Sequence, residues 1–215
     1  MIPDRCATFI AAHSALRPVP EVPEISLYAA DDAFSLWEAV ERETGRSGEP
    51  PPFWAFAWPG GQALARYILD HPGQVAGRRV LDLGSGSGLT AIACALAGAS
   101  TVLASELDPF GVAAIGLNAS ANDVSITVTG DVLGGAGENA QVVLAADIWY
   151  ERQLAQRALG LLQRARSRGA DVLVGDIGRA FLPRPLMREL AAYDVPVIAE
   201  LEDAAVKRVL ILTLR

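Results

Sequence analysis

The stretch Asp82-Leu83-Gly84-Ser85-Gly86-Ser87-Gly88 decides the fold of this chain. The apolar segment Arg79–Leu83 leads into it and predicts a strand, and Leu89–Ala97 follows as a predicted helix. Glycines between a strand and a helix let the backbone turn sharply. They also let a ligand approach the amide groups at the helix N-terminus, where the helix dipole favours an anion. The stretch therefore predicts a site for a nucleotide-type ligand that carries an anionic group.

The spacing of these glycines differs from the common dinucleotide fingerprint. The pattern G-x-G-x-x-G needs a third glycine where this chain has Leu89. The glycines alternate instead as G-x-G-x-G behind an acidic residue, Asp82. A nicotinamide-binding oxidoreductase is therefore disfavoured.

Three acidic residues lie at the ends of three successive predicted strands, namely Asp82, Glu106 and Asp131. Glu106 is placed to accept hydrogen bonds from both hydroxyls of a ribose, and Asp131 to accept one from an adenine amino group. Each of these acids alone could equally be a turn or cap residue. Together they indicate a binding edge, because the carboxyl ends of parallel strands meet at one side of a sheet and open α/β folds bind ligands there.

The rest of the chain alternates between short apolar strands and helices, which is typical of a parallel sheet with crossover helices. Val195–Leu201 and Val206–Leu214 face each other across Glu202-Asp203 and predict an antiparallel hairpin. The expected fold class is α/β, with a doubly wound, mostly parallel sheet of seven strands. Further strands are expected at Thr101–Ser105, Ile126–Thr129, Val142–Ala146 and Val172–Gly175, and further helices at Gly60–Asp70, Pro109–Ala119, Glu151–Ser167 and Pro185–Ala192.

Residues 1–52 predict an accessory layer in front of a main domain that spans residues 53–215. We expect a short helix at Asp4–Ala15 and extended chain around Pro18, Pro20 and Pro23. Asp31 is expected to cap a helix with one apolar face.

Composition narrows the class of protein. The 215 residues are 51% apolar with a net charge of −7, which fits one soluble domain and disfavours a nucleic-acid substrate, because nucleic-acid affinity comes largely from Lys and Arg. Cys6 and Cys94 are expected to be buried thiols, and two histidines are too few for a zinc site.

The uncharged run from Gly88 to Ser105 is interrupted by Gly98 and predicts a helix and a strand rather than a membrane span. With no targeting segment recognised, we expect a cytoplasmic protein.

The glycine motif, the acids and the terminal hairpin resemble the seven-strand S-adenosylmethionine-dependent methyltransferases. Two further motifs are Trp54-Ala55-Phe56-Ala57-Trp58-Pro59-Gly60-Gly61-Gln62 and Asp147-Ile148-Trp149-Tyr150. They are similar to motifs of the protein lysine methyltransferases that modify the β-subunit of electron transfer flavoprotein, including bacterial relatives. The chain departs from that family at Ile177, where the family has proline, and at Glu106, where aspartate is commoner. The resemblance implies a Rossmann-like methyltransferase fold.

The resemblance also implies a cofactor, S-adenosyl-L-methionine, and its binding residues. Asp82 or its neighbours would meet the ammonium, the backbone from Gly84 to Gly88 the carboxylate, and the ring of Trp58 the sulfonium. The full set implied for cofactor binding is Trp58, Gly61, Asp82, Gly84, Ser85, Gly86, Gly88, Glu106, Asp131 and Asp147.

Asp147 and Tyr150 are the implied catalytic residues, at the place where the methyl group would emerge. A free lysine has a pKa near 10.4, so about one part in a thousand is neutral at pH 7.5. A hydrophobic channel would depress this pKa, Asp147 would orient the amine, and Tyr150 would form a wall of the channel.

The implied substrate is the flavoprotein β-subunit, with a ribosomal stalk protein as a further acceptor for bacterial relatives. The alternatives are a methyltransferase for a small amine or other metabolite, and a nucleotide-binding oxidoreductase or non-catalytic binding module. Outside the motifs, we expect Asn118 and Asn122 to be turn or cap residues, and Arg179 and Arg184 to be solvated.

Overall fold

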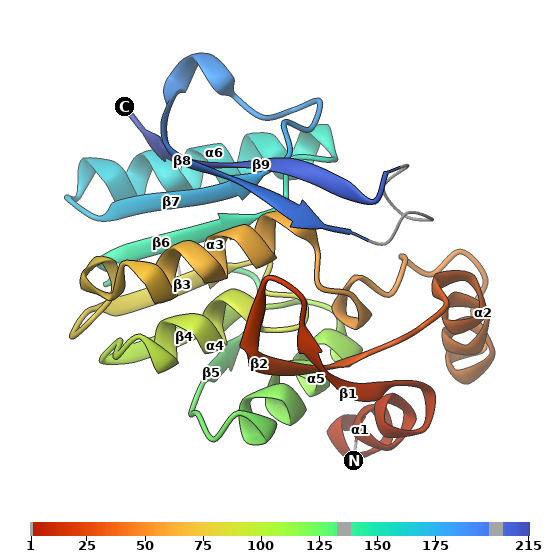
Figure 1. The fold of residues 1–215 in the computed structure, drawn as a ribbon. Coiled ribbons are helices and arrows are strands. Elements are labelled where there is room, and N and C mark those ends of the chain that lie inside the picture. The colour runs from red at the N-terminus through yellow and green to blue at the C-terminus, as the bar shows by residue number, and fades with distance from the viewer. Residues whose placement is uncertain (1, 133–138, 198–203) are drawn as a thin grey trace.

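A seven-stranded sheet forms the centre of the protein (Figure 1). The computed structural model describes residues 2–132, 139–197 and 204–215. The strand order is β5-β4-β3-β6-β7-β9-β8, and the five strands β3 to β7 run parallel, as predicted. Their bounds are Arg79–Leu83 (β3), Thr101–Ser105 (β4), Thr127–Thr129 (β5), Val142–Ala146 (β6) and Asp171–Asp176 (β7).

Helices cover both faces of this sheet. Successive strand residues point to opposite faces, so apolar side chains on each face need a helix layer to bury them. Val142 and Leu144 of β6 pack in one apolar cluster with residues of α3, α4 and α5, whereas Val143 and Ala145 pack with residues of α6 on the other face. The parallel strands are therefore mostly apolar, as a doubly covered parallel sheet requires, and their polar residues lie mainly at or near the strand ends. The helix bounds are Pro59–Asp70 (α3), Leu89–Leu96 (α4), Pro109–Ala121 (α5) and Arg152–Ser167 (α6), with a short 3₁₀ turn at Pro72–Gln74.

The C-terminal part of the sheet is an antiparallel hairpin, as predicted, but its first strand starts earlier. β8 spans Met187–Pro196 and pairs with β9 at Val206–Leu214, which in turn pairs with β7. The expected helix at Pro185–Ala192 is therefore wrong: only Arg184–Leu186 form a 3₁₀ turn, and β8 takes up the rest. Of the expected strand Val195–Leu201, residues 198–201 and the turn at Glu202-Asp203 lie outside the described residues.

The N-terminal segment is a helix, a hairpin and a second helix. α1 spans Ile2–His13, β1 and β2 pair antiparallel over Ala15–Val19 and Val22–Ala29, and α2 spans Ala33–Thr44. Pro18 and Pro23 thus lie in extended chain as expected, whereas Pro20 lies in the turn between the two strands of a hairpin that the sequence did not indicate.

The cap of α2 corrects one prediction. Asp32, not Asp31, is the N-cap and accepts a hydrogen bond from the backbone N–H of Ser35, while Asp31 pairs with Arg17. A 3₁₀ turn at Phe53–Ala55 then leads into α3. No helix within the described ranges combines the length and apolar character needed to cross a membrane.

Candidate functional site

A pocket of about 900 Å³ opens at the carboxyl ends of the parallel strands. Strand order reverses direction between β3 and β6, since the chain runs outward to β4 and β5 on one side and to β7 on the other. Open α/β sheets bind ligands in the crevice at such a switch point. The pocket walls come from the glycine loop after β3, the ends of β4 and β6, and the segment between α2 and α3.

The glycine loop has the backbone conformation that its sequence predicts. Gly84, Gly86 and Gly88 all have positive φ angles, of 66°, 55° and 85°. Such angles are unfavourable for residues other than glycine. The turn therefore requires glycine at these three alternating positions. The loop is anchored to the sheet by a hydrogen bond from the N–H of Ser85 to the carbonyl of Ser105 at 3.0 Å.

Asp82 lies beneath this loop. Among the described residues that line the pocket, Asp82 is not included. Its side chain is fully buried, and its carboxylate accepts a hydrogen bond from the hydroxyl of Ser85. Burial raises the pKa of Asp82, and the hydrogen bonds from Ser85 and Thr90 partly oppose that shift. The structure thus places Asp82 as a support of the loop, and its direct contact with a ligand ammonium stays a prediction.

Glu106 and Asp131 do line the pocket. One carboxylate oxygen of Glu106 accepts the N–H of Gly86 at 2.8 Å, and the other accepts the N–H groups of Leu107 and Asp108. Asp131 pairs with Arg157 at 2.8 Å. Two of the three predicted acids therefore reach the pocket, and Glu106 also fixes the glycine loop against the end of β4.

Aromatic side chains form another part of the pocket wall. The indole N–H of Trp58 donates to the carbonyl of Phe53 at 2.8 Å, and the Phe53 ring lies 5.8 Å from the Trp58 ring and 5.5 Å from the Tyr150 ring, between centroids. Tyr150 is 48% exposed, so it lies at the mouth of the pocket. Burial raises the pKa of Tyr150, Glu106 and Glu151 raise it further, and Arg179 opposes them.

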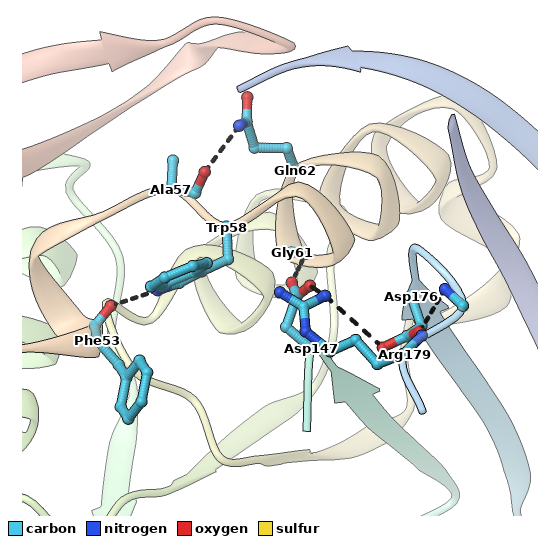
Figure 2. A network of polar contacts seen from close by, with 9 residues as sticks. Phe53, Ala57, Trp58, Gly61, Gln62, Asp147, Asp176 and Arg179 are labelled. Carbon is cyan, nitrogen blue, oxygen red and sulfur yellow. Dashed lines mark hydrogen bonds and ion pairs between the residues drawn. The ribbon is translucent and has the colours of Figure 1, made fainter. Parts of the chain in front are cut away.

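Asp147 is held between two elements (Figure 2). One of its carboxylate oxygens accepts the N–H of Gly61, in the first turn of α3, at 2.8 Å, and the other pairs with the guanidinium of Arg179 at 2.7 Å. Both charged side chains are nearly buried, with 11% of Asp147 and 14% of Arg179 exposed. Gly61 thus lines the pocket as predicted and also positions Asp147.

The loop after β7 turns Arg179 toward this carboxylate. One oxygen of Asp176 accepts the N–H groups of Gly178 and Arg179 at 2.6 and 2.7 Å, and its other oxygen lies 3.9 Å from the Arg179 guanidinium. Burial raises the pKa of Asp176, and Arg179 opposes that shift. The expectation of a solvated Arg179 is therefore wrong. The strand-end rule that found the three acids would also have found Arg179, because it follows a fifth parallel strand.

Two other sequence features have different roles from those expected. Asn118 is buried within α5 and is no turn residue: its amide oxygen accepts the N–H of Tyr28, and its amide nitrogen donates to the carbonyl of Ser87, both at 2.8 Å. Asn122 is the C-cap of α5 as expected, and its side chain also bonds both backbone groups of Ser26. These asparagines tie β2 to the helix and to the glycine loop.

The segment between α2 and α3 contributes pocket residues that the sequence reasoning missed. The run Pro50-Pro51-Pro52, directly before the aromatic motif, was the available signal, since consecutive prolines hold a chain extended. The additional lining residues are Val40 and Thr44 at the end of α2, and Arg46, Glu49, Pro50, Pro51, Pro52 and Phe53 in the segment that follows.

Comparison with known proteins places this geometry in a family. The family model described as Ribosomal protein L11 methyltransferase (PrmA) matches residues 62–157. A Xenopus laevis protein, named electron transfer flavoprotein beta subunit lysine methyltransferase, is 38% identical over 187 residues, which cover 85% of this chain and 75% of that protein. The chain belongs to this lysine methyltransferase family. A Danio rerio member with the same name is 40% identical over 154 residues, which cover 68% of this chain and 60% of that protein.

The match to solved structures confirms the fold. Magnesium protoporphyrin IX methyltransferase from Synechocystis PCC 6803, solved with bound SAM, superposes with a TM-score of 0.54 at 15% identity, covering 86% of this chain and 92% of that one. At this identity the likeness concerns architecture alone. The family member described here thus has the Rossmann-like methyltransferase fold, with its pocket at the ligand-binding edge of the sheet.

Proposed function

We propose that this protein is an S-adenosylmethionine-dependent protein-lysine N-methyltransferase whose acceptor is an exposed lysine of a folded protein. The observation that carries the proposal is the position of Asp147 and Tyr150. Both line the pocket at the end of β6, and Tyr150 lies at its mouth, in a chain of this lysine methyltransferase family. The named acceptor of the relatives, electron transfer flavoprotein β-subunit, is the first candidate substrate.

The residues of the pocket fit the proposed cofactor. A volume of about 900 Å³ is ample for a nucleoside joined to an amino acid. Glu106 and Asp131 would hold the adenosine part, the glycine loop the carboxylate, and the Trp58 face the sulfonium. When bound, this cofactor supplies an electrophilic methyl group: the acceptor nitrogen forms the new N–C bond while the C–S bond breaks and its electron pair stays on sulfur.

Asp147 and Tyr150 would prepare the acceptor for this displacement. An in-line transfer needs chiefly an aligned nitrogen lone pair, so orientation is the largest contribution that the protein can make. The Asp147 carboxylate, fixed by Gly61 and Arg179, would orient the amine. Tyr150 and Phe53 would form the walls of a channel that strips water from the lysine side chain.

The mouth of the pocket favours a macromolecular acceptor over a small metabolite. Tyr150 and Leu107 line the pocket and are 48% and 67% exposed. An enzyme for a small amine would be expected to close over its substrate. A methyltransferase for a small amine remains the second candidate, and it predicts no labelled protein in the assay below.

Calorimetry tests the cofactor assignment. We expect S-adenosylmethionine to bind in preference to NAD or NADP, and Gly86→Val to abolish that binding, because valine at a φ of 55° distorts the loop. The matched control is Gly77→Val, which imposes the same strain at a φ of 70° on an exposed turn away from the pocket. A preference for NAD, or equal binding by Gly86→Val, would refute the assignment.

Mass spectrometry tests the acceptor. Purified flavoprotein β-subunit is incubated with enzyme and cofactor, and lysine methylation is read from peptide masses. We expect methylated peptides with the native enzyme, whereas Asp147→Ala binds the cofactor normally and transfers at least tenfold more slowly. Labelling of small amines without any protein product would favour the second candidate.

A further inference from the structure

Arg179 is the charged residue at the pocket whose position the expected mechanism leaves unexplained. Its guanidinium lies in the pocket wall, 2.7 Å from one carboxylate oxygen of Asp147, and it is only 14% exposed. The Asp176 carboxylate fixes the turn by accepting the backbone N–H groups of Gly178 and Arg179. An arginine built into this position contributes a permanent positive charge beside the predicted exit of the methyl group.

A carboxylate alone would be unfavourable at this place. A negative charge within about 4–6 Å stabilises an ammonium and raises its pKa, which lowers the fraction of neutral lysine. The transfer needs the neutral amine, and a free lysine is already almost wholly protonated at neutral pH. Asp147 therefore needs a counter-charge that lets it orient an amine without holding an ammonium.

The other charged groups around the pocket are held by different partners. The Glu106 carboxylate accepts three backbone N–H groups, and the Glu151 carboxylate caps α6 by accepting those of Gln153 and Leu154. Asp176 is buried below Arg179, and the exposed Arg184, whose guanidinium lies beside Gly178, also acts on Asp176. Arg46 and Glu49 pair with each other at the pocket wall, and Asp108 caps α5. The charged and titratable groups to be considered are thus Arg46, Glu49, Glu106, Asp108, Asp131, Asp147, Tyr150, Glu151, Asp176, Arg179 and Arg184.

We propose that Arg179 is a positioning residue that neutralises Asp147, so that the acceptor lysine is oriented in the pocket as an amine and is not trapped there as an ammonium. This inference rests on the proposed function, the methylation of a protein lysine. The lysine gives up its proton to bulk solvent before transfer, and the Arg179 charge favours that loss. Arg179 also repels the acceptor while it is still charged, so it lowers the affinity for the protonated lysine in exchange for a larger reactive fraction.

The test is the pH dependence of kcat and of the acceptor KM at saturating cofactor, between about pH 6.5 and 9.5. With Arg179→Met we expect the rising limb of kcat to move up by about one pH unit, which is a tenfold loss at pH 7.5. The acceptor KM should fall, because the bare Asp147 binds the ammonium more tightly. Arg179→Lys retains the charge and should keep the limb near its native position.

Two further variants separate charge from structure. Asp147→Asn alone removes the negative charge beside Arg179 in the pocket wall and should move the limb to lower pH, although transfer slows. The double variant Asp147→Asn with Arg179→Met should return the limb to its native position. Arg188→Met, which removes an exposed positive charge from β8 outside the pocket wall, is the matched control and should move neither the limb nor KM.

The possible outcomes are distinguishable. If Arg179→Met lowers kcat by the same factor at every pH, or raises the acceptor KM, the proposal is overturned and Arg179 is structural or binds the acceptor. Unchanged affinity for S-adenosylhomocysteine and an unchanged Tm show that the variant is folded. Should Arg179→Met fail to fold, the test rests on Arg179→Lys and Asp147→Asn, and the quantity measured is the pH at which kcat rises in each variant. If the native enzyme methylates no lysine, the proposed function itself fails and this proposal fails with it.

Discussion

Asp147 has a backbone conformation that is uncommon for a residue with a side chain. Its φ is 57°, and its N–H donates to the carbonyl of Gly175 at the end of β7. Such a conformation costs about 1–3 kcal/mol and persists only where surrounding contacts fix it. Here the fixing contacts are Gly175, Gly61 and Arg179. The strain is concentrated at the residue on which the proposed chemistry depends.

Gly60 packs directly against Asp147, so a substitution at Gly60 tests how tightly Asp147 is held. A β-carbon at position 60 would lie 2.3 Å from the carbonyl oxygen of Gly175 and 2.6 Å from a carboxylate oxygen of Asp147. We expect Gly60→Ala to push α3 away from β7, at a cost of about 1–3 kcal/mol in the free energy of unfolding. Methyl transfer should fall at least tenfold, because Asp147 is displaced. Chemical denaturation and the mass-spectrometric assay measure the two effects.

Gly116→Ala is the control for that substitution. Gly116 lies on the exposed side of α5, and a β-carbon there would meet no atom within 4 Å. Alanine should stabilise the helix by up to about 1 kcal/mol and leave transfer unchanged. Equal activity of the Gly60 and Gly116 variants would contradict the packing argument.

The sequence predicted the site residues that follow a local rule. The glycine loop, Glu106 and Asp131 were found because strand ends and turns can be recognised from a few neighbouring residues. The strand-end rule could also have placed Arg179 at the pocket, but it could not show that Arg179 pairs with Asp147, 32 residues away along the chain. Asn118 was misjudged because its partner Tyr28 lies 90 residues away, and a lone asparagine in a sequence carries no sign of such a partner.

At the scale of elements, α5 connects the pocket to the N-terminal hairpin. Asn118 bonds the N–H of Tyr28 in β2 and the carbonyl of Ser87 in the glycine loop. Burying these two backbone groups without partners would cost about 1–3 kcal/mol each. One side chain in this helix therefore fixes two elements that are distant in the sequence.

Replacement of Asn118 tests this connection. We expect Asn118→Ala to lower the free energy of unfolding by about 2–4 kcal/mol, because both backbone groups lose their hydrogen bonds. The affinity for S-adenosylhomocysteine should fall about tenfold, since Ser87 belongs to the loop that is proposed to bind it. Ser120→Ala, at an exposed position of the same helix, should change neither quantity. Calorimetry showing native affinity for the Asn118 variant would disprove the coupling to the loop.

The element that the sequence misassigned is β8. Arg188, Glu189, Leu190 and two alanines favour a helix by intrinsic propensity. In the folded chain this stretch pairs with β9 from Met187 opposite Leu214 to Pro196 opposite Val206, with one irregularity at Leu190. A partner strand that follows later in the chain overrides local preference. The parallel strands were predicted correctly because burial on both faces makes most of their residues apolar.

At the scale of the whole molecule, the N-terminal segment shares its core with the sheet. Val19, Val22, Ile25 and Leu27 are almost completely buried and pack in the same cluster as residues of α3, α4 and β3. Burying four such side chains contributes roughly 6–12 kcal/mol at about 1.5–3 kcal/mol each. That is comparable to the net stability of a typical domain, about 5–15 kcal/mol. The division at residue 52, a prediction from composition, therefore separates parts that stabilise each other.

This shared core predicts a single cooperative unfolding transition. We expect Ile25→Ala to cost about 2–5 kcal/mol through the cavity that it leaves, and to lower the midpoint for the entire protein. Circular dichroism of the sheet and helices and tryptophan fluorescence should give coincident curves. Leu16→Ala, at a 47% exposed position of the same hairpin, should change stability by no more than about 0.5 kcal/mol. Ile25→Ala could instead produce an early transition and leave the unfolding midpoint of the sheet unchanged. That result would contradict the prediction and show that residues 1–52 fold as a separate unit.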